Sequence, residues 1–343
     1  MARGWDQGSG ELSPYFFDLD KYWTKFRYVF SDACRKRTTY KFALIKSIID
    51  SLYSAEYTPH GMKLPYSKVF AKFTENYWNL ITKHEVCQII PDGKTNVSRI
   101  EKLILQVRDR NVAFKELNYE DLSVDEQNQL VEKVQEQCSQ NVMGALFMDF
   151  ADQESDGIYR GTLYGFSNAQ KVLWLHMCAY EFLMKHKLEI EQLNYMAWAK
   201  FLEKINKNVS QRQIIDKLEL ATPKRSNLSV YRNILREEFE ENNCFYCGTK
   251  LSSKTPVDHV IPWSFVKSDH LWNFALACPS CNSKKSNLLP SKTKLAAIEE
   301  RNKKMIVDQD PFVMKEMEGY TKDLLWKLWD YASMQGYKVF EKS

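Results

Sequence analysis

The sequence predicts a mainly α-helical protein, with a helical N-terminal domain followed by a small ββα unit near the C-terminus. Three observations support this fold class. The chain has 343 residues, the length of about two domains. It contains only 12 glycines and 10 prolines, and long stretches place apolar residues at helical spacing. Finally, two Cys-x-x-Cys pairs near the C-terminus enclose a short β-type run, which predicts a small unit of different architecture.

Helices account for most of the predicted N-terminal domain, which covers residues 14–220 after a flexible tail at residues 1–13. Ser98 and Ser123 are each followed three residues later by a glutamate. This is the pattern of a capping box, so each serine is expected to open a helix. The other predicted helices share an apolar stripe at helical spacing and cover residues 18–34, 39–55, 68–84, 168–185 and 188–206.

Two β segments interrupt this helical pattern. Residues 86–90 are a strand candidate that ends at a Pro-Asp-Gly turn. Residues 141–166 predict a hairpin whose turn lies at residues 155–157. The order helix, helix, strand over residues 39–96 is compatible with part of a winged-helix DNA-binding domain, although structural and partner-binding helical domains share it. The N-terminal domain is therefore expected to recognise a target or a protein partner. Formation of a homodimer through this domain is an alternative.

The domain boundary is predicted at residues 221–227, a polar segment that contains a proline. After it we expect a helix at about 229–241 and then the ββα unit, which together make a domain of residues 228–300. Residues 301–343 are predicted to form a helical extension, because the stretch 313–334 is amphipathic. This extension is expected to pack back on one of the domains.

Composition and charge limit the class of protein. No run of about 18 apolar residues is present, so no membrane span is expected. The N-terminal residues lack the apolar core of a signal peptide, and a cytoplasmic location is expected. The net charge of the whole chain is only +4. Residues 243–298, however, hold seven lysines and two aspartates, and this local charge of +5 favours contact with phosphates.

The strongest motif consists of Cys244, Cys247, Cys278 and Cys281. Two Cys-x-x-Cys pairs can close a tetrahedral Zn²⁺ site, since each short loop aims two soft thiolates at one point. Thirty residues lie between the pairs, more than the roughly 15 to 20 of a common four-cysteine zinc module. A Zn²⁺ ion bound by four thiolates has no open coordination position, so this ion is predicted to be structural.

The interval between the cysteine pairs holds residue types that bind a catalytic metal and move protons. Asp258 and His259 end a β-type run, where strand alternation would direct them to opposite faces. An imidazole can take a proton from water near neutral pH. A carboxylate suits a hard divalent cation. A second pair of this kind, Asp269 and His270, is expected to lie in a solvated loop.

Together these residues resemble the HNH nucleases, also called ββα-metal nucleases, of the four-cysteine zinc-bound type. The resemblance runs through the four cysteines, the run Asp258-His259-Val-Ile-Pro262, Asn273, and Asn282-x-x-Lys285. It concerns the C-terminal segment only. The fold that it implies is a ββα-metal unit stapled by zinc.

The resemblance also implies a role for each matching residue. His259 falls on the general base that activates water, and Asn273 falls on the asparagine that fixes the loop and orients this histidine. Asp258 falls on a ligand of the catalytic divalent cation. Asn282 falls where many relatives carry a histidine that is the second metal ligand. Since an amide supplies a carbonyl oxygen, this pair suits Mg²⁺ or Mn²⁺.

Three lysines are candidates for contact with nucleic acid. Lys285 falls on a lysine that could contact the phosphate during catalysis. Lys254 and Lys284 are also expected to contact the nucleic acid. For Lys284 the reason is that a basic helix start beside a metal site favours phosphate.

The function implied by the resemblance is that of a metal-dependent endonuclease that hydrolyses DNA and leaves a 5′-phosphate and a 3′-hydroxyl. RNA is not excluded as a substrate. Many nucleases that look like this serve in prokaryotic defence or restriction. Two alternatives stay open. The first is a zinc-dependent nucleic-acid-binding module without catalysis, and the second is a nuclease subunit that is active only in a multi-protein complex.

Overall fold

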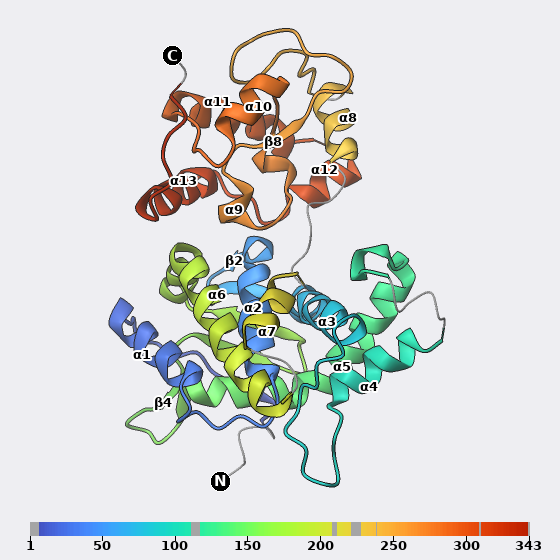
Figure 1. Cartoon of the computed structure of the whole chain (residues 1–343). Coiled ribbons are helices and arrows are strands. Elements are labelled where there is room, and N and C mark those ends of the chain that lie inside the picture. Colours follow the sequence, from blue (N-terminus) through green and yellow to red (C-terminus); the bar gives the residue numbers. More distant parts are fainter. Residues whose placement is uncertain are drawn as a thin grey trace. The chain divides into compact units, whose positions relative to one another are not determined.

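The computed structural model describes residues 7–110, 117–207, 211–220, 228–237, 239–308 and 310–341 (Figure 1). Its contacts divide the chain into two compact units, residues 1–223 and 224–343. Helices dominate both units, which confirms the predicted fold class. The predicted boundary segment itself, residues 221–227, lies outside the described residues. Within the described ranges, no helix combines the length and the apolar composition that a membrane crossing requires.

The N-terminal unit is built around a group of long helices. Its helices are α1 (Leu19–Phe30), α2 (Tyr40–Asp50), α3 (Tyr66–Thr82), α4 (Arg99–Arg108), α5 (Val124–Phe150), α6 (Met177–Ile205) and α7 (Gln211–Leu220). Helix α2 packs against α3, α5 and α6. The largest fully buried side chains in this core are the indoles of Trp78 and Trp198. Both predicted capping boxes are present, at Ser98 with Glu101 and at Ser123 with Glu126, and they begin α4 and α5.

A five-stranded antiparallel sheet belongs to the same unit. Its strands are β1 (Ser9–Gly10), β2 (Glu56–Thr58), β3 (Gly61–Pro65), β6 (Tyr164–Ser167) and β7 (Val172–Leu175), in the order β1-β6-β7-β3-β2. The turn between β2 and β3 requires Gly61, whose φ is +118° and whose added Cβ would lie 2.4 Å from the carbonyl oxygen of Leu175. Strands β4 (Ala151–Gln153) and β5 (Tyr159–Gly161) form a separate hairpin.

Several sequence predictions for this unit are wrong in detail. The hairpin predicted for 141–166 begins only at Ala151, ten residues later than predicted. Residues 142–150 instead continue α5 to Phe150, because their buried side chains recur at helical spacing. The helix predicted for 168–185 begins only at Met177, since 172–175 are β7. Helix α6 then runs on to Ile205 through a kink at His186, where two helices were predicted.

Two further segments differ from their predictions. Residues 86–90 form no regular strand, and Ile89 makes a single bridge to Thr38. Of the predicted tail 1–13, residues 1–6 lie outside the described residues, but Ser9 and Gly10 pair with β6. The N-terminal segment is therefore tied to the sheet. Residues 39–96 show the order helix, strand, strand, helix, and a winged-helix role for them stays a prediction.

The C-terminal unit is a small ββα arrangement surrounded by helices. Its elements are α8 (Ser229–Glu237), β8 (Val257–His259), α9 (Trp263–Val266), β9 (Phe274–Leu276), α10 (Pro279–Lys285), α11 (Lys292–Ile306), α12 (Pro311–Glu316) and α13 (Leu324–Met334) (Figure 1). Strands β8 and β9 are antiparallel, with His259 opposite Phe274. The predicted extension packs on this unit, since the indole of Trp329 donates to the carbonyl oxygen of Pro290 at 2.8 Å.

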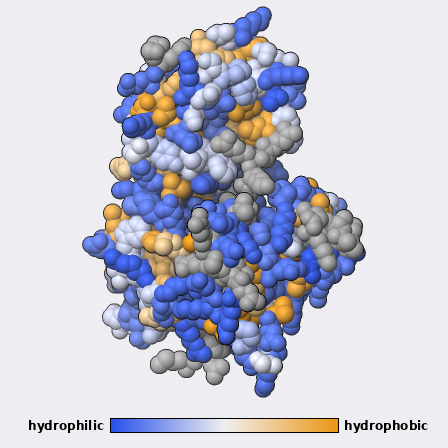
Figure 2. All heavy atoms as spheres, viewed as in Figure 1, coloured by the Kyte–Doolittle hydropathy of each residue, from blue (hydrophilic) through white to orange (hydrophobic). Residues whose placement is uncertain are grey.

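One face of the surface is largely polar (Figure 2). On the face shown in Figure 2, hydrophilic side chains dominate and apolar side chains form small scattered groups.

Candidate metal and catalytic site

The four cysteine sulfurs of the C-terminal unit converge on one point. All four lie within 4.8 Å of one another, and the Sγ atoms of Cys247 and Cys278 are 3.8 Å apart. Tetrahedral Zn²⁺ with Zn–S bonds of about 2.3 Å needs sulfurs about 3.8 Å apart. The cluster therefore fits a zinc ion, as the sequence predicts.

Local backbone geometry explains why these sulfurs meet. Gly248, at φ +75°, lets the first Cys-x-x-Cys loop turn, and its amide donates to the carbonyl oxygen of Cys244 at 2.8 Å. Cys278 is the N-cap of α10, which places Cys281 one turn later on the same side. The amide of Cys278 also donates to the Sγ of Cys244 at 3.2 Å, which links the two cysteine pairs.

The thiols differ in their acidity before any cation is bound. Hydrogen bonds from Thr249 lower the pKa of the Cys247 thiol to about 6. Burial raises the pKa of Cys281 to about 12. A cation among the four sulfurs would favour the thiolate form of all of them.

Asp258, His259 and Asn282 line one cavity of about 380 Å³, although strand alternation predicted opposite faces for the first two. The alternation does not apply because β8 ends at His259. The amide side chain of Asn282 comes from α10, the helix that also carries the second cysteine pair. The second cysteine pair and the candidate metal ligand Asn282 thus share one short helix, while Asp258 comes from β8. The remaining lining residues are Leu228, Val257, Trp263, Ser283, Ser286 and Asn287.

The carboxylate of Asp258 is held at one oxygen by two buried donors. Its Oδ2 accepts from the hydroxyl of Tyr246 at 2.5 Å and from Nζ of Lys285 at 3.1 Å. Lys285 also donates to the carbonyl oxygen of His259 at 2.6 Å and is fully buried. Burial lowers the pKa of this lysine, an effect that the Asp258 carboxylate opposes. The sequence predicts that Lys285 touches phosphate. In the structure this ammonium is buried and instead binds the carboxylate of Asp258 and the carbonyl oxygen of His259 at the end of β8.

The imidazole of His259 has a carboxylate partner that sequence reasoning missed. Its Nε2 lies 2.7 Å from Oδ1 of Asp269, and the side chains are 7% and 14% exposed. The ring edge packs on Phe274, with centroids 4.8 Å apart. Asp269 was expected in a solvated loop with His270. A histidine and an aspartate ten residues apart give no sequence signal of contact, because the loop between them decides whether they meet.

Asn273 closes the loop that follows His259. Its Oδ1 accepts from the amide of Ile261 at 2.8 Å, and its Nδ2 donates to the carbonyl oxygen of the same residue at 2.9 Å. The amide of Val260 donates to the carbonyl oxygen of Asn273 at 2.8 Å. Asn273 is fully buried, and its hydrogen bonds join it to the two residues that follow His259. Its role in orienting the histidine stays a prediction.

The other two candidate lysines lie on the surface, and their contact with nucleic acid stays a prediction. Lys254 lies in the loop before β8 and Lys284 lies on α10, and both are exposed. Lys284 directly precedes the buried Lys285, so the two neighbouring lysines of α10 have opposite environments.

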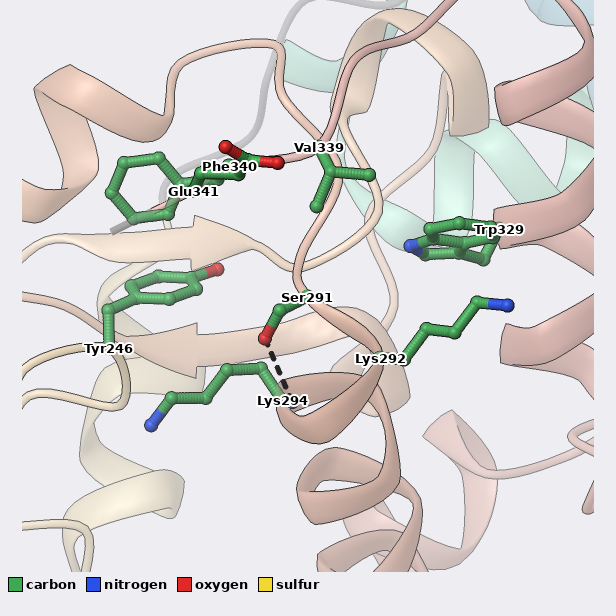
Figure 3. Close-up of a pocket in the computed structure, with 8 residues that line it drawn as sticks. All are labelled: Tyr246, Ser291, Lys292, Lys294, Trp329, Val339, Phe340 and Glu341. Carbon is green, nitrogen blue, oxygen red and sulfur yellow. Dashed lines mark hydrogen bonds between the residues drawn. The ribbon is translucent and has the colours of Figure 1, made fainter. Parts of the chain in front are cut away.

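Tyr246 links this site to a second pocket of about 470 Å³ (Figure 3). While its hydroxyl binds Asp258, its ring lines the second pocket together with Lys292 and Lys294 of α11. Nζ of Lys292 lies 5.1 Å from the ring centre of Trp329. These contacts hold the start of α11 and the C-terminal segment beside the zinc knuckle.

Residues 244–288 match the family model described as HNH endonuclease. The C-terminal unit contains an HNH domain. The match confirms the resemblance seen in the sequence, and it includes all four cysteines, both strands and α10. Comparison with curated proteins and with solved structures gave no match. The HNH domain indicates a nuclease-type function and a nucleic-acid substrate for this chain.

Proposed function

We propose that this protein is a metal-dependent endonuclease that hydrolyses phosphodiester bonds of DNA. The observation that carries the proposal is the shared cavity of His259, Asp258 and Asn282 in the HNH domain. A base and two oxygen ligands for a hard cation line one space, as phosphodiester hydrolysis requires. RNA has the same phosphodiester chemistry and belongs in the substrate panel that tests the proposal.

His259 is the proposed general base. Because an ionised carboxylate only accepts hydrogen bonds, the contact with Asp269 assigns the proton of the neutral ring to Nε2. The lone pair is then on Nδ1, which takes a proton from the attacking water. The water oxygen forms the new bond to phosphorus, the bond to the 3′ oxygen breaks, and this oxygen takes a proton from a solvent water molecule. The products are a 5′-phosphate and a 3′-hydroxyl.

Asp258 and Asn282 are the proposed ligands of Mg²⁺ or Mn²⁺. Their donor atoms are a carboxylate and an amide oxygen, which these hard cations prefer. When bound there, the cation would neutralise charge on the phosphate and on the departing oxygen. Tyr246 and Lys285 contribute by fixing the Asp258 carboxylate through Oδ2.

Two other groups of residues support the chemistry without entering it. The four cysteines would hold a structural zinc ion, which keeps β8 and α10 in register. Lys254 and Lys284 would contact phosphates that flank the scissile bond.

A plasmid-nicking assay with Mg²⁺ or Mn²⁺ tests the proposal. We expect His259→Ala to reduce cleavage by about 10²-fold or more, since a general base contributes that much. His60→Ala, an exposed histidine of the N-terminal unit, is the matched control and should cut like the wild type. Equal cutting by His259→Ala and the wild type would overturn the assignment of the base.

The same assay separates the two alternative functions. A zinc-dependent binding module without catalysis would bind the plasmid but would not nick it, whichever metal ion is added. A subunit that works only in a complex would cut after addition of a cell extract but not as the purified chain. A panel with unmodified DNA, modified DNA and RNA tests the further part of the proposal, a role in prokaryotic defence or restriction.

A further inference from the structure

A basic groove crosses the N-terminal unit, well separated in sequence from the HNH domain. It has a volume of about 950 Å³ and is lined by the loop before α2, the segment before α4, and by α2, α4 and α5. None of the described lining residues is acidic. Six of them are basic, namely Arg35, Lys36, Arg37, Lys41, Arg99 and Lys102.

Carboxylates outside the groove neutralise only part of this charge. Lys41 pairs with Asp149 at 2.6 Å, and Arg37 pairs with Asp92. The ammonium of Lys36 instead donates to the carbonyl oxygen of Ser31 at 2.7 Å. Such contacts with neutral carbonyls leave the positive charge uncompensated.

Two of the six cations are available to an external anion. Arg35 and Lys102 are both exposed, and within the part of the chain that the structure describes neither has a carboxylate at ion-pair distance. Arg99 is also exposed and donates to the carbonyl oxygen of Gln137 at 2.7 Å. The groove therefore has a net positive charge on exposed side chains of two elements, the loop before α2 and helix α4.

The exposure of these cations identifies the class of ligand. A site for a small molecule buries most of its ligand among apolar walls. A nucleic-acid backbone is instead tracked by exposed lysines and arginines that neutralise successive phosphates. Amide side chains, here Gln106, Gln137 and Asn141, are suitable donors to phosphate and sugar oxygens beside them.

We propose that the basic groove binds the phosphodiester backbone of a nucleic-acid strand, so that the N-terminal unit contacts the substrate independently of the HNH domain. The choice of nucleic acid as the ligand rests on the proposed nuclease function. The contact would hold the substrate without touching the scissile bond. Loss of this contact is therefore expected to raise KM and to leave kcat unchanged.

Binding of a fluorescent DNA oligonucleotide to the full-length His259→Ala chain tests this inference. We expect Arg35→Glu combined with Lys102→Glu to weaken binding by about tenfold or more and to reduce the slope of log K against log salt by about one for each lost phosphate contact. Lys171→Glu is the control, because Lys171 is exposed in the same unit and does not line the groove. This control should bind like its parent chain.

Three results would overturn the inference. They are unchanged binding by the double variant, an equal loss in Lys171→Glu, and competition by a mononucleotide as effective as that by the oligonucleotide. The last result would assign the groove to a small phosphorylated molecule. The outcome is distinct from that of the nicking assay, since a chain that binds DNA through the groove without cutting it would refute only the proposed hydrolysis.

Discussion

The ring of His259 is held on two sides, by the carboxylate of Asp269 and by the ring of Phe274. An imidazole in this position cannot rotate freely, and its tautomer is fixed by the acceptor at Nε2. In the proposed reaction, the carboxylate would face the positive charge that the ring gains with the proton of the attacking water. Asp269 is therefore a positioning residue for the proposed base, although it does not line the cavity with His259.

Asp269→Asn should lower kcat by roughly 10- to 100-fold while KM changes little, because the amide can present its NH₂ group to Nε2 and favour the wrong tautomer. Asp269→Glu, which retains a carboxylate, should recover part of the loss. Steady-state cleavage of a labelled duplex measures both constants. Asp323→Asn, at an exposed aspartate of the same unit, is the control. A change confined to KM would contradict the positioning role.

Contacts that depend on spacing within a motif could be predicted, and contacts that depend on burial could not. The four cysteines meet as expected because two short loops fix their directions. The environment of Lys285 was not predictable from its neighbour Lys284, since one turn of α10 faces both solvent and core. The partner of His259 was equally hidden, because the chain between His259 and Asp269, which contains the short helix α9, must fold back before the two side chains meet.

At the scale of elements, α8 and α12 support the strand that faces His259. Tyr231 of α8 packs on Phe274 with centroids 4.7 Å apart and donates to Glu316 of α12 at 3.1 Å. Helix α12 begins at Pro311, and the side chain of its N-cap Asp310 accepts hydrogen bonds from the amides of Phe312 and Val313. This cap fixes the short helix, which ends at Glu316. Burial raises the pKa of Glu316 above its usual 4.5, and Asp269 adds to the effect.

This raised pKa predicts how stability depends on pH. Between pH 4.5 and the raised pKa, the folded chain holds more protons on Glu316 than the unfolded chain does. Stability from this group is therefore lost as the pH rises through that window. Glu316→Gln should remove this dependence and raise the melting temperature at pH 7.5 relative to the wild type. Thermal unfolding at pH 5 and pH 7.5 measures it.

The exposed Glu341 provides the control for this prediction, since Glu341→Gln should leave both melting temperatures unchanged. An equal fall in the melting temperature of Glu316→Gln at both pH values would mean that its bond with Tyr231 matters more than its charge.

The accuracy of the predicted elements follows the strength of their local signals. Helices α4 and α5 begin where capping boxes place them, because a capping box satisfies backbone donors with nearby side chains. Residues 172–175 were predicted as helix, since four apolar residues in a row fit a buried helix and a buried strand equally. Pairing with β3 and β6, which lie far away in sequence, decides the matter.

At the scale of the molecule, the N-terminal unit and the zinc knuckle differ in the size of their apolar cores. The N-terminal unit buries large aromatic side chains such as Trp78, Trp198 and Tyr77 among long helices. Around the zinc knuckle the core is small, and it consists of Cys244, Tyr246, Ala277 and Cys281 with a few partly buried neighbours. A core of this size needs an additional constraint, and structural zinc contributes on the order of 10–16 kcal/mol in small zinc modules.

Metal removal should therefore affect one unit and spare the other. We expect purified protein to contain about one zinc ion per chain and Cys278→Ser to lose it, because three thiolates cannot complete the tetrahedral site. Limited proteolysis of Cys278→Ser, or of the wild type with a strong zinc chelator, should digest residues 224–343 first and leave the N-terminal unit resistant. Mass spectrometry of the fragments shows which of the two units is digested first.

Cys178→Ser is the control. It changes a half-buried cysteine of α6, and this variant should retain its zinc and its resistance to the protease. Digestion of both units at the same rate would show instead that they unfold together, and that zinc is not what stabilises the HNH domain.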